Sequence, residues 1–433
     1  MITRKNKARI ILFILLAFLS FCLISFFYII FSPLKGNVTL GLLFYSLGKL
    51  AGLIGFLFLS LLIISGDTAR FFDRYFGIDK IIKFQRKFAL ITSVFILFHP
   101  IFFILSSKLP ISYLILDFTA IPLALGIISL YIFIIVMICS LVYKRISYNL
   151  WQYIHILTYL LFFFSLYHAA NWGSNSGNLF IRGIYLLLLV AIIMGIIYRT
   201  YYKIKQRENK FYVKEVKMET KDTFSLILKP NKKFNFKAGQ FCFLRLNKDR
   251  LYARHPFTIS GSPDEEDLHF TIKLNGEFTK IALELKKGEE VIVEGPFGIF
   301  TLDEAEEKEI VFIAGGVGIT PFISMIKSNL YSSIKKNIAL FYCSRTLKGT
   351  IFKKELDNIK EDWLKKVYIF SEDECQGYEK GVINKSFISK YVKDINNSVF
   401  FICGPEQIKK CVINELKGLG IRKENIIVED FFW

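Results

Sequence analysis

The sequence of 433 residues predicts a multi-domain membrane protein, with a six-helix transmembrane bundle followed by an antiparallel β-barrel domain and an α/β Rossmann-like domain. Three observations lead to this fold class. Long apolar stretches fill residues 1–205, and short strands broken by glycine and proline fill residues 211–305. In residues 306–433, buried strands alternate with helices after a glycine-rich turn.

Six apolar stretches form the predicted bundle, and most reach the roughly 20 residues that a helix needs to cross a hydrocarbon core. They cover approximately residues 10–31, 41–65, 88–105, 120–142, 150–168 and 180–200. The first follows the basic residues Arg4, Lys5, Lys7 and Arg9, as the apolar part of a cleaved signal peptide would. It is too long for a signal peptide and no small-residue cleavage site follows it, so we interpret it as the first membrane helix.

The distribution of basic residues predicts the orientation of the bundle. Residues 1–210 carry 21 Lys+Arg against 5 Asp+Glu, whereas residues 211–433 carry 35 against 32. With the N-terminus inside, the cytoplasmic segments hold 17 Lys+Arg, and the outside loops hold only Lys35 and Lys108. This asymmetry predicts a multi-pass protein of the cell membrane with both termini cytoplasmic. The basic surplus therefore reflects topology, and no nucleic-acid partner is expected.

Histidines are the candidate metal ligands of the bundle. The seven cysteines include no CxxC pair or close cluster, which argues against a zinc or iron–sulfur site. Three of the five histidines, His99, His155 and His168, lie in predicted membrane helices, where a polar ring suggests either a haem site or interhelical hydrogen bonds. His155 and His168 lie about 20 Å apart along one helix. His99 is level with His168, so these two can be opposed ligands of one outer haem.

Two membrane motifs resemble the ferric reductase and NADPH oxidase superfamily of the bacterial type. One runs from residue 77 to residue 100, and the other from residue 151 to residue 168. The resemblance implies two histidines in each helix and two stacked b-type haems. This chain departs from the pattern, because Gln85, followed by Arg86, stands at the inner position of the first motif. The inner haem is then five-coordinate on His155, held by another ligand, or absent.

Two basic residues are candidate partners of haem propionates. Lys49 lies within the second apolar stretch, toward its outer side, where it either snorkels to the surface or pairs with an outer-haem propionate. Arg86 either pairs with an inner haem in the same way or adds to the positive charge of the cytoplasmic side.

The predicted barrel follows a short charged linker at about residues 203–210. Apolar and polar residues alternate from Phe211 onward, as in a half-buried strand. Further barrel strands are predicted at Ser225–Lys229, Gln240–Leu246, His269–Leu274 and Val291–Glu294. We expect a turn at residues 295–298 to close the barrel, and buried strands of the next domain at Asn337–Cys343 and Ser398–Cys403.

A flavin site is suggested by the segment Arg254-His255-Pro256-Phe257-Thr258-Ile259-Ser260, which closely resembles the flavin-binding strand of the ferredoxin-reductase superfamily. The resemblance implies FAD as a cofactor. It also implies that Phe257 lines the isoalloxazine, that Thr258 lies near N5, and that Arg254 or His255 lies near the diphosphate. A plain strand after a proline is the alternative.

A second part of the flavin site is expected where Gly276-Glu277-Phe278-Thr279 opens a helical stretch. The backbone N–H groups at a helix start are unsatisfied and lie at the positive end of the helix dipole, so they suit a pyrophosphate. Taken alone, the segment would be an ordinary helix cap.

A nicotinamide dinucleotide site is suggested by the turn Ala314-Gly315-Gly316-Val317-Gly318-Ile319-Thr320-Pro321, which follows a strand and precedes a helix. Its glycines let the backbone approach a dinucleotide phosphate. A later strand ends in Cys403-Gly404-Pro405, which in the resembling family borders the nicotinamide; a buried strand residue is the alternative for Cys403. Arg345, after Ser344 at the end of another strand, suits the 2′-phosphate of NADP, which favours NADPH over NADH. A solvated arginine, with NADH as the donor, is the alternative.

The last residue has an implied role as well. In this superfamily a C-terminal aromatic residue covers the flavin where the nicotinamide must stack, so Trp433 is the candidate lid. A frayed terminus is the alternative, although three terminal aromatic residues would be sticky. Thr258, Cys403 and Trp433 are therefore the candidate residues at the hydride-transfer step.

Together the motifs imply an NAD(P)H-dependent flavocytochrome oxidoreductase. Cytosolic NAD(P)H is expected to reduce FAD, and haem b, one or two per chain, to carry electrons to an extracytoplasmic acceptor. Ferric chelates are favoured by analogy with the resembling bacterial branch. Dioxygen, reduced to superoxide or peroxide, and a dedicated partner protein stay open as acceptors. A membrane-anchored flavin reductase without haem is a further alternative.

Overall fold

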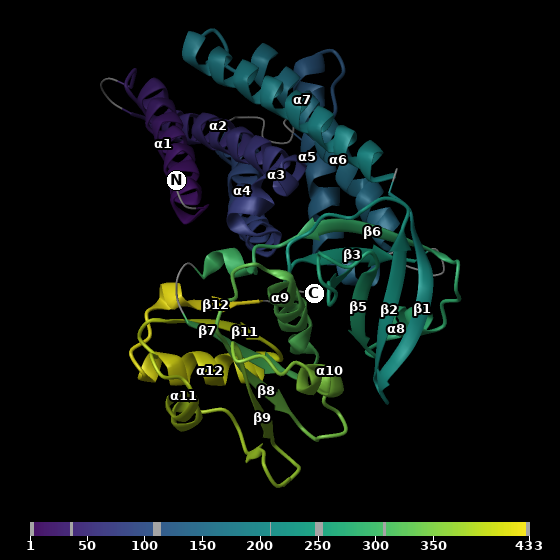
Figure 1. Ribbon diagram of the computed structural model, residues 1–433. Helices are drawn as coiled ribbons and strands as arrows, with labels where there is room; N and C mark the ends of the chain where they lie inside the picture. Colours follow the sequence, from purple (N-terminus) through teal and green to yellow (C-terminus); the bar gives the residue numbers. More distant parts are fainter. Residues whose placement is uncertain are drawn as a thin grey trace. The chain divides into compact units, whose positions relative to one another are not determined.

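The computed structural model gives the chain as two compact units, Met1–Lys205 and Gln206–Trp433 (Figure 1). We call them the membrane unit and the reductase unit, and each is described by itself. The structure describes residues 4–34, 38–106, 114–207, 209–246, 254–305 and 309–429. Lys35, Lys108 and Trp433, which the sequence analysis singled out, lie outside the described residues.

The described residues of the membrane unit include six helices long and apolar enough to cross a bilayer, which confirms the six predicted spans. They are α1 (Arg4–Phe31), α2 (Leu40–Asp67), α4 (Ile78–Ser106), α5 (Ile121–Leu141), α6 (Tyr148–Asn171) and α7 (Leu179–Arg207). A short amphipathic helix that was not predicted, α3 (Ala69–Phe76), follows α2. It ends at Gly77, whose φ of 82° favours glycine, and the Asp73 carboxylate accepts a hydrogen bond from the Ile78 N–H at 2.7 Å.

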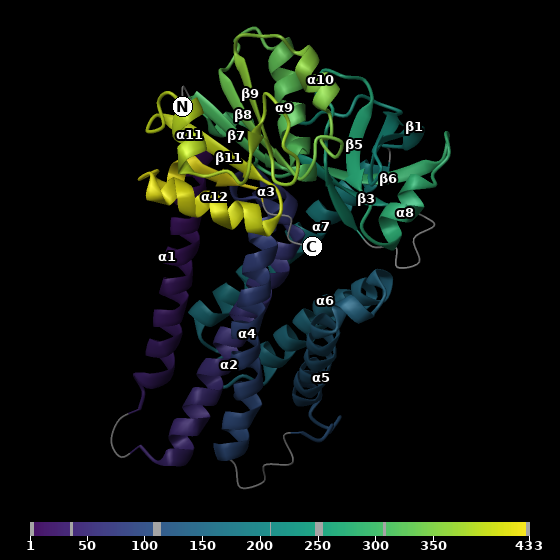
Figure 2. The ribbon, with the colours of Figure 1, turned by 90° about the horizontal axis from the view of Figure 1, so that it is seen from below.

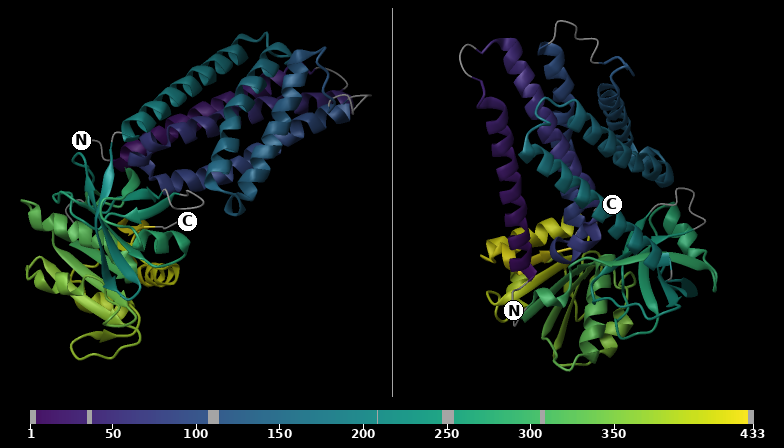
Figure 3. Two further views of the ribbon diagram at one scale, coloured as in Figure 1. Left: turned by 90° about the vertical axis from the view of Figure 1, so that its right-hand side faces the viewer. Right: turned by 90° about the horizontal axis from the view of Figure 1, so that it is seen from above.

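Helix α2 is the central helix of the membrane unit. Within its apolar window 56% of the residues are buried, against 33% or less in the other spans. Small residues let α4 approach closely, because Gly48 lies under the Phe103 ring and Gly55 lies against Ile96. Figures 2 and 3 show α2 and α4 running side by side. The close approach places the α4 side chains directly on the α2 backbone.

The reductase unit begins with the predicted antiparallel barrel. Its strands are β1 (Phe211–Thr220), β2 (Thr223–Pro230), β3 (Phe241–Arg245), β4 (His255–Thr258), β5 (Leu268–Lys273) and β6 (Glu290–Phe297). They pair in the order β4-β3-β6-β1-β2-β5, and a bridge between Ile259 and Phe270 joins the two ends of the sheet. Helix α8 (Glu277–Leu283) follows β5, and Phe224 and Ile272 are among the fully buried side chains inside.

The expected turn at residues 295–298 was wrong. Residues 295–297 belong to β6, in which Phe297 pairs with Phe241 of β3. A Cβ at Gly295 would lie 2.5 Å from the Cys242 sulfur, so glycine lets β6 pass close to β3 at a register shift in their pairing. Glycine and proline suggested a turn, but here they allow a long strand to continue past an irregularity.

The α/β domain is a parallel sheet with helices on both faces. Its strands are β7 (Glu309–Gly315), β8 (Ile338–Ser344), β9 (Leu364–Phe370), β10 (Glu379–Lys380), β11 (Ser398–Cys403) and β12 (Ile426–Val428). Its helices are α9 (Thr320–Tyr331), α10 (Lys353–Asn358), α11 (Lys385–Tyr391) and α12 (Glu406–Gly418). The strand order is β10-β9-β8-β7-β11-β12, so the chain reverses its direction of travel across the sheet beside β7.

Alternation along the strands divides this domain into two cores. Phe312 and Leu340 pack with α9 and α10, whereas Val311 and Phe341 pack with α11 and α12 on the opposite face. Figure 2 shows the two pairs of helices on the two faces of the sheet. The fold therefore matches the predicted doubly wound domain, with the carboxyl ends of β7 and β11 next to each other at the topological switch point.

Candidate functional site

His99 of α4 and His168 of α6 face each other in the membrane unit. Their ring centroids are 6.3 Å apart, with an angle of 80° between the rings. An iron atom bound at about 2 Å from a nitrogen of each of two opposed imidazoles requires centroids roughly 6 Å apart. The spacing between these two rings therefore fits a metal ion with two axial imidazole ligands.

A backbone carbonyl oxygen lies within hydrogen-bond distance of Nδ1 of each ring. Nδ1 of His99 lies 2.8 Å from the carbonyl oxygen of Gly48, and Nδ1 of His168 lies 2.9 Å from that of Pro122. A carbonyl oxygen only accepts hydrogen bonds, so each Nδ1 carries the proton and donates it. The lone pair of each imidazole is then on Nε2, which is the form that binds a metal.

Both rings lie on glycines that the sequence analysis did not identify. A Cβ at Gly52 of α2 would be 2.6 Å from Nδ1 of His99, and a Cβ at Gly126 of α5 would be 2.5 Å from Nδ1 of His168. Each glycine is four residues after the residue whose carbonyl binds the ring. The four-residue spacing is about one turn along a helix face, and it becomes meaningful only once a histidine ring from another helix is packed on that face.

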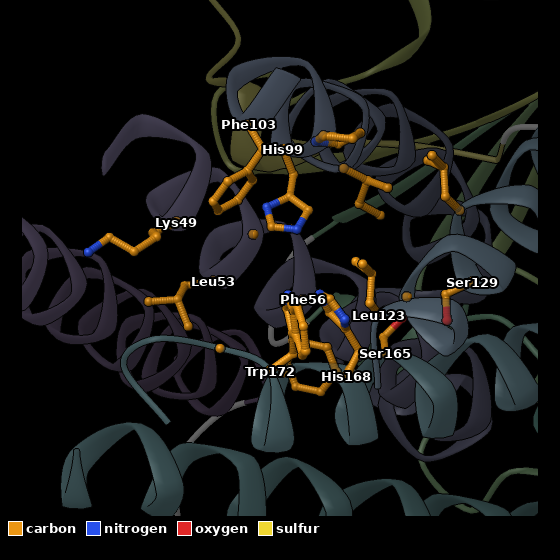
Figure 4. A pocket seen from close by; sticks show the side chains of 18 of the residues that line it. Lys49, Leu53, Phe56, His99, Phe103, Leu123, Ser129, Ser165, His168 and Trp172 are labelled. Atoms are coloured by element: carbon orange, nitrogen blue, oxygen red, sulfur yellow. The ribbon is translucent and has the colours of Figure 1, made fainter. Parts of the chain in front are cut away.

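The two rings extend into a cavity of about 290 Å³ in the membrane unit (Figure 4). This volume is near the lower end of the range for small-molecule sites. Lys49 is the one fully charged residue among the described residues that line it, and its ammonium group lies 5.0 Å from the centroid of the Tyr45 ring. The loop after α6 contributes the polar side chains Ser174 and Ser176.

The inner candidate position has different chemistry. The Gln85 side chain donates a hydrogen bond to the Ser65 hydroxyl at 3.0 Å, and the Arg86 guanidinium lies 5.4 Å from the Tyr143 ring. The His155 ring stacks on Trp151 with centroids 4.6 Å apart. Since His99 and His168 face each other, His155 has no histidine to face among the described residues of the bundle.

A buried ionic cluster on α2, α6 and α7 was also missed. The Asp67 carboxylate accepts hydrogen bonds from the Tyr159 hydroxyl at 2.5 Å and from Arg199 at 3.1 Å, and both bonds meet at Oδ1. The Asp67 side chain is 1% exposed and that of Arg199 is 38% exposed. The sequence did carry a signal for this cluster. An acidic residue ends one apolar stretch, and an arginine lies near the end of another.

The predicted flavin strand is β4, which pairs with β3 at one end of the barrel sheet. The His255 ring stacks on Phe278 with centroids 3.9 Å apart, and the Phe257 ring stacks on the same Phe278 at 5.7 Å. Arg254 forms an ion pair with Glu294 at 2.8 Å. The structure therefore brings together side chains from the two predicted flavin segments, Arg254–Thr258 and Gly276–Thr279.

Thr258 is the most telling residue of this strand. It is 5% exposed, and its Oγ1 atom is buried and has no hydrogen-bond partner among the described residues. A buried unpartnered hydroxyl is costly, so a polar group of a bound ligand is the expected partner. Nearby, Gly276 has a φ of 103°, and the Thr279 hydroxyl accepts from the Asn275 N–H at 2.8 Å. These contacts order the turn before α8.

The glycine-rich turn lies against the end of β11. A Cβ at Gly318 would be 2.3 Å from the carbonyl oxygen of Cys403, and a Cβ at Gly404 would be 3.0 Å from the Gly315 backbone. Only glycine permits such an approach of two backbones. Gly316, with a φ of 54°, has open space where a side chain would be, which leaves room for a phosphate.

Side chains at the start of α9 connect this turn to the flavin strand. Thr320 donates to the Val317 carbonyl at 3.1 Å, and Pro321 occupies the first turn of α9. Ser324, in the next turn of α9, donates to the Gly261 carbonyl at 2.6 Å. Because Gly261 is three residues beyond Thr258, the dinucleotide turn and the flavin strand lie beside each other.

The remaining predicted residues vary in their surroundings. Pro405 adjoins Gly315, and Cys403 is fully buried at the end of β11. Ser344 donates to the Thr346 carbonyl at 3.2 Å, and Arg345 has an 85% exposed side chain, 3.9 Å from the Glu372 carboxylate.

Tyr342 and Cys343 were not identified from the sequence. Tyr342 donates to the Gly316 carbonyl at 3.2 Å and so supports the glycine turn from the neighbouring strand. Its burial raises the pKa of its hydroxyl. Burial also raises the pKa of the Cys343 thiol to about 12, so this cysteine is a neutral core residue.

Three family models match consecutive parts of the chain. Residues 51–166 match the ferric reductase like transmembrane component, residues 208–301 match an FAD-binding domain, and residues 312–413 match the oxidoreductase NAD-binding domain. The chain has the domain architecture of the ferric reductase and NADPH oxidase superfamily. Like the superfamily, it combines a multi-pass membrane domain with flavin- and nicotinamide-binding reductase domains.

Individual relatives match only part of this architecture. A flavohemoprotein of Oceanobacillus iheyensis is 23% identical over 235 residues, which are 51% of this chain and 57% of the relative. One component of the Na(+)-translocating NADH-quinone reductase of a Marinomonas species is 31% identical over 182 residues, 40% of this chain and 43% of the relative. The chain thus spans about half the length of these curated relatives.

Solved structures are similar over a comparable share of the chain. A flavohemoglobin from Malassezia yamatoensis, determined with bound FAD and heme, has a TM-score of 0.48 and 22% identity, covering 63% of this chain and 73% of that one. The FAD/NAD-binding domain of a nitric oxide dioxygenase from Vibrio cholerae has a TM-score of 0.47 and 21% identity, covering 52% and 98%.

Proposed function

We propose that the chain transfers electrons from cytosolic NADPH through FAD and haem b to ferric chelates on the far side of the membrane. The observation that carries the proposal is the pair of facing imidazoles of His99 and His168 inside an apolar bundle. Bound FAD would supply hydride acceptance and single-electron release, and haem b would supply one-electron transfer through the bundle. The residues of the chain bind, orient and enclose these groups.

We propose that His99 and His168 would hold one haem. Two features support this assignment. The Gly48 and Pro122 carbonyls keep the proton on Nδ1, so the lone pair on Nε2 of each ring would be available to iron. Lys49, at the wall of the same cavity, is the candidate partner for a propionate, because carboxylates in an apolar cavity need a cation.

We propose one haem rather than two. Gln85 is engaged with Ser65, and its amide is a weaker iron ligand than an imidazole. His155 stacks on Trp151, and Arg86 lies over Tyr143. A second haem at this level would have one histidine at most, whereas the outer pair offers two that are already oriented.

The reductase unit is proposed to hold FAD along β4 and the start of α8. Thr258 would donate its free hydroxyl to the isoalloxazine edge, with Phe257 beside the ring and His255 or Arg254 near the diphosphate. Gly276, Phe278 and Thr279 would complete the pyrophosphate side. The proposed FAD contacts are Arg254, His255, Pro256, Phe257, Thr258, Gly276, Phe278, Thr279 and Trp433.

The nicotinamide dinucleotide is proposed to bind where β7 and β11 end. The open backbone at Gly316 suits its pyrophosphate, and Cys403 at the end of β11 would border the nicotinamide. The exposed Arg345 is the candidate partner of a 2′-phosphate, which favours NADPH. The proposed contacts are Gly315, Gly316, Gly318, Thr320, Pro321, Ser344, Arg345, Cys403, Gly404 and Pro405.

The orientation follows from the positive-inside rule, with the reductase unit cytoplasmic. His99 and His168 then lie in the outer half of the bundle, near the loop between α6 and α7. Ferric chelates are the proposed acceptor by analogy with the resembling bacterial branch.

The test uses the full chain with FAD and haem in sealed vesicles, with NADPH added only on the reductase side and ferric citrate only on the other. We expect Fe(II) to appear in the acceptor compartment, and a matched His168→Leu chain with full flavin loading to give none. Superoxide formation with unreduced ferric citrate would favour the oxidase alternative. If a preparation without haem reduced only a soluble dye that accepts electrons directly from the flavin, the transmembrane proposal would be contradicted.

A further inference from the structure

We infer that Gly52 and Gly126 are positioning residues that hold the two imidazoles in register for one metal. The inference rests on the proposed function, because it concerns the same pair of rings. His99 and His168 belong to α4 and α6, whereas the two glycines belong to their respective neighbours α2 and α5. Each ring therefore depends on a residue that is remote from it in the sequence.

The same arrangement occurs twice in the bundle. The His99 ring lies on α2, with Nδ1 on the Gly48 carbonyl and the ring edge over Gly52. The His168 ring lies on α5, with Nδ1 on the Pro122 carbonyl and the ring edge over Gly126. In both cases a carbonyl at one position and a glycine four residues later form a flat seat on the helix.

Steric contact makes glycine necessary at both seats. A Cβ at Gly52 would be 2.6 Å from Nδ1 and 2.7 Å from Cε1 of His99. A Cβ at Gly126 would be 2.5 Å from Nδ1 and 2.8 Å from Cε1 of His168. Carbon and nitrogen atoms that are not bonded need more than about 3 Å, so the ring must move away from the carbonyl.

At a helix position without such a steric constraint, replacing glycine with alanine is expected to stabilise the helix. Within a helix, alanine is more favourable than glycine by about 1 kcal/mol. An alanine at either seat should therefore stabilise the isolated helix but misplace the imidazole. Loss of an outer hydrogen bond to a ligating histidine typically costs about 10- to 100-fold in metal affinity, so roughly a tenfold loss is the expected scale for each seat.

The experiment titrates haem into the full FAD-loaded chain and records the near-infrared and EPR signatures of axial ligation. We expect Gly52→Ala and Gly126→Ala to weaken haem binding about tenfold or more and to change the low-spin two-histidine signature. Two matched control variants should leave the haem affinity and the ligation signature unchanged. Gly183 in α7 has open space where the alanine Cβ of Gly183→Ala would lie. The Cβ of Gly195→Ala would be in close contact with Asp67, away from the cavity.

A second pair of variants covers the case in which Gly52→Ala fails to fold. His99→Gly removes the ring that would clash, so His99→Gly with Gly52→Ala should fold as well as His99→Gly alone. Failure of that double variant, or haem binding by Gly52→Ala and Gly126→Ala equal to that of the wild-type chain, would overturn the inference. A wild-type chain that takes up no haem would instead overturn the proposed function.

Discussion

The ionic cluster of Asp67, Tyr159 and Arg199 allows a quantitative test of how the membrane unit is held together. Replacing Arg199 with methionine keeps much of the side-chain volume but removes the cation from a carboxylate that is 1% exposed. Breaking a fully buried ion pair costs about 3–5 kcal/mol, because the remaining charge is left uncompensated. The Arg199 side chain is 38% exposed, so solvent screening reduces the expected cost to about 2 kcal/mol.

The assay is thermal unfolding of the full chain in one fixed detergent. For a unit of about 200 residues, 1 kcal/mol corresponds to roughly 2–4 °C, so Arg199→Met should lower the unfolding midpoint by about 4–8 °C. The double variant Asp67→Leu with Arg199→Met leaves no unpaired charge and should lose less than Arg199→Met alone. Additive losses from Asp67→Leu and Arg199→Met would refute the reasoning, because coupled partners are not additive.

Three further predictions concern the reductase unit. Gly318→Ala should weaken NADPH binding while FAD content is retained, because its Cβ would lie 2.3 Å from the Cys403 carbonyl oxygen. Gly418→Ala is the control, since Gly418 has open space around it. Isothermal titration measures the NADPH affinity of both variants. Thr258→Val should leave the stability of the flavin-free chain unchanged or higher, because the Thr258 hydroxyl has no hydrogen-bond partner in the described part of the protein. It should shift the reduction potential of bound flavin, because the hydroxyl is expected to bond the ligand. An unchanged potential would contradict this. Burial raises the pKa of the Cys343 thiol to about 12, so iodoacetamide at a pH of about 8 should modify the partly exposed Cys375 and spare Cys343, as read by peptide mass; equal modification would contradict the structure.

The sequence predicted the architecture because its signals are local. Six apolar stretches became six spans, and the strand ending in Cys403 was predicted with the bounds that the structure gives, Ser398–Cys403. The turn expected at residues 295–298 failed because glycine and proline mark both turns and strand irregularities. Helix α3 was missed because eight amphipathic residues beside a long apolar helix give little periodic signal.

The site could be predicted only where its residues carry recognisable chemistry. His99 and His168 were paired from their depth in the membrane, and the structure places them face to face. Gly52 and Gly126 were missed because a glycine in a membrane helix is common, and its purpose depends on a ring from another helix. Asp67 and Arg199 are 132 residues apart, so their pairing is a property of the packed bundle.

The ratio of haem to FAD in the purified full chain, measured together with the axial-ligand spectrum, decides whether the facing imidazoles hold a haem in the bundle. We expect one low-spin haem per FAD, and loss of its two-histidine signature in both His99→Leu and His168→Leu, with His155→Leu unchanged. A fully flavin-loaded chain that shows no Soret band after haem supply would contradict this mechanism.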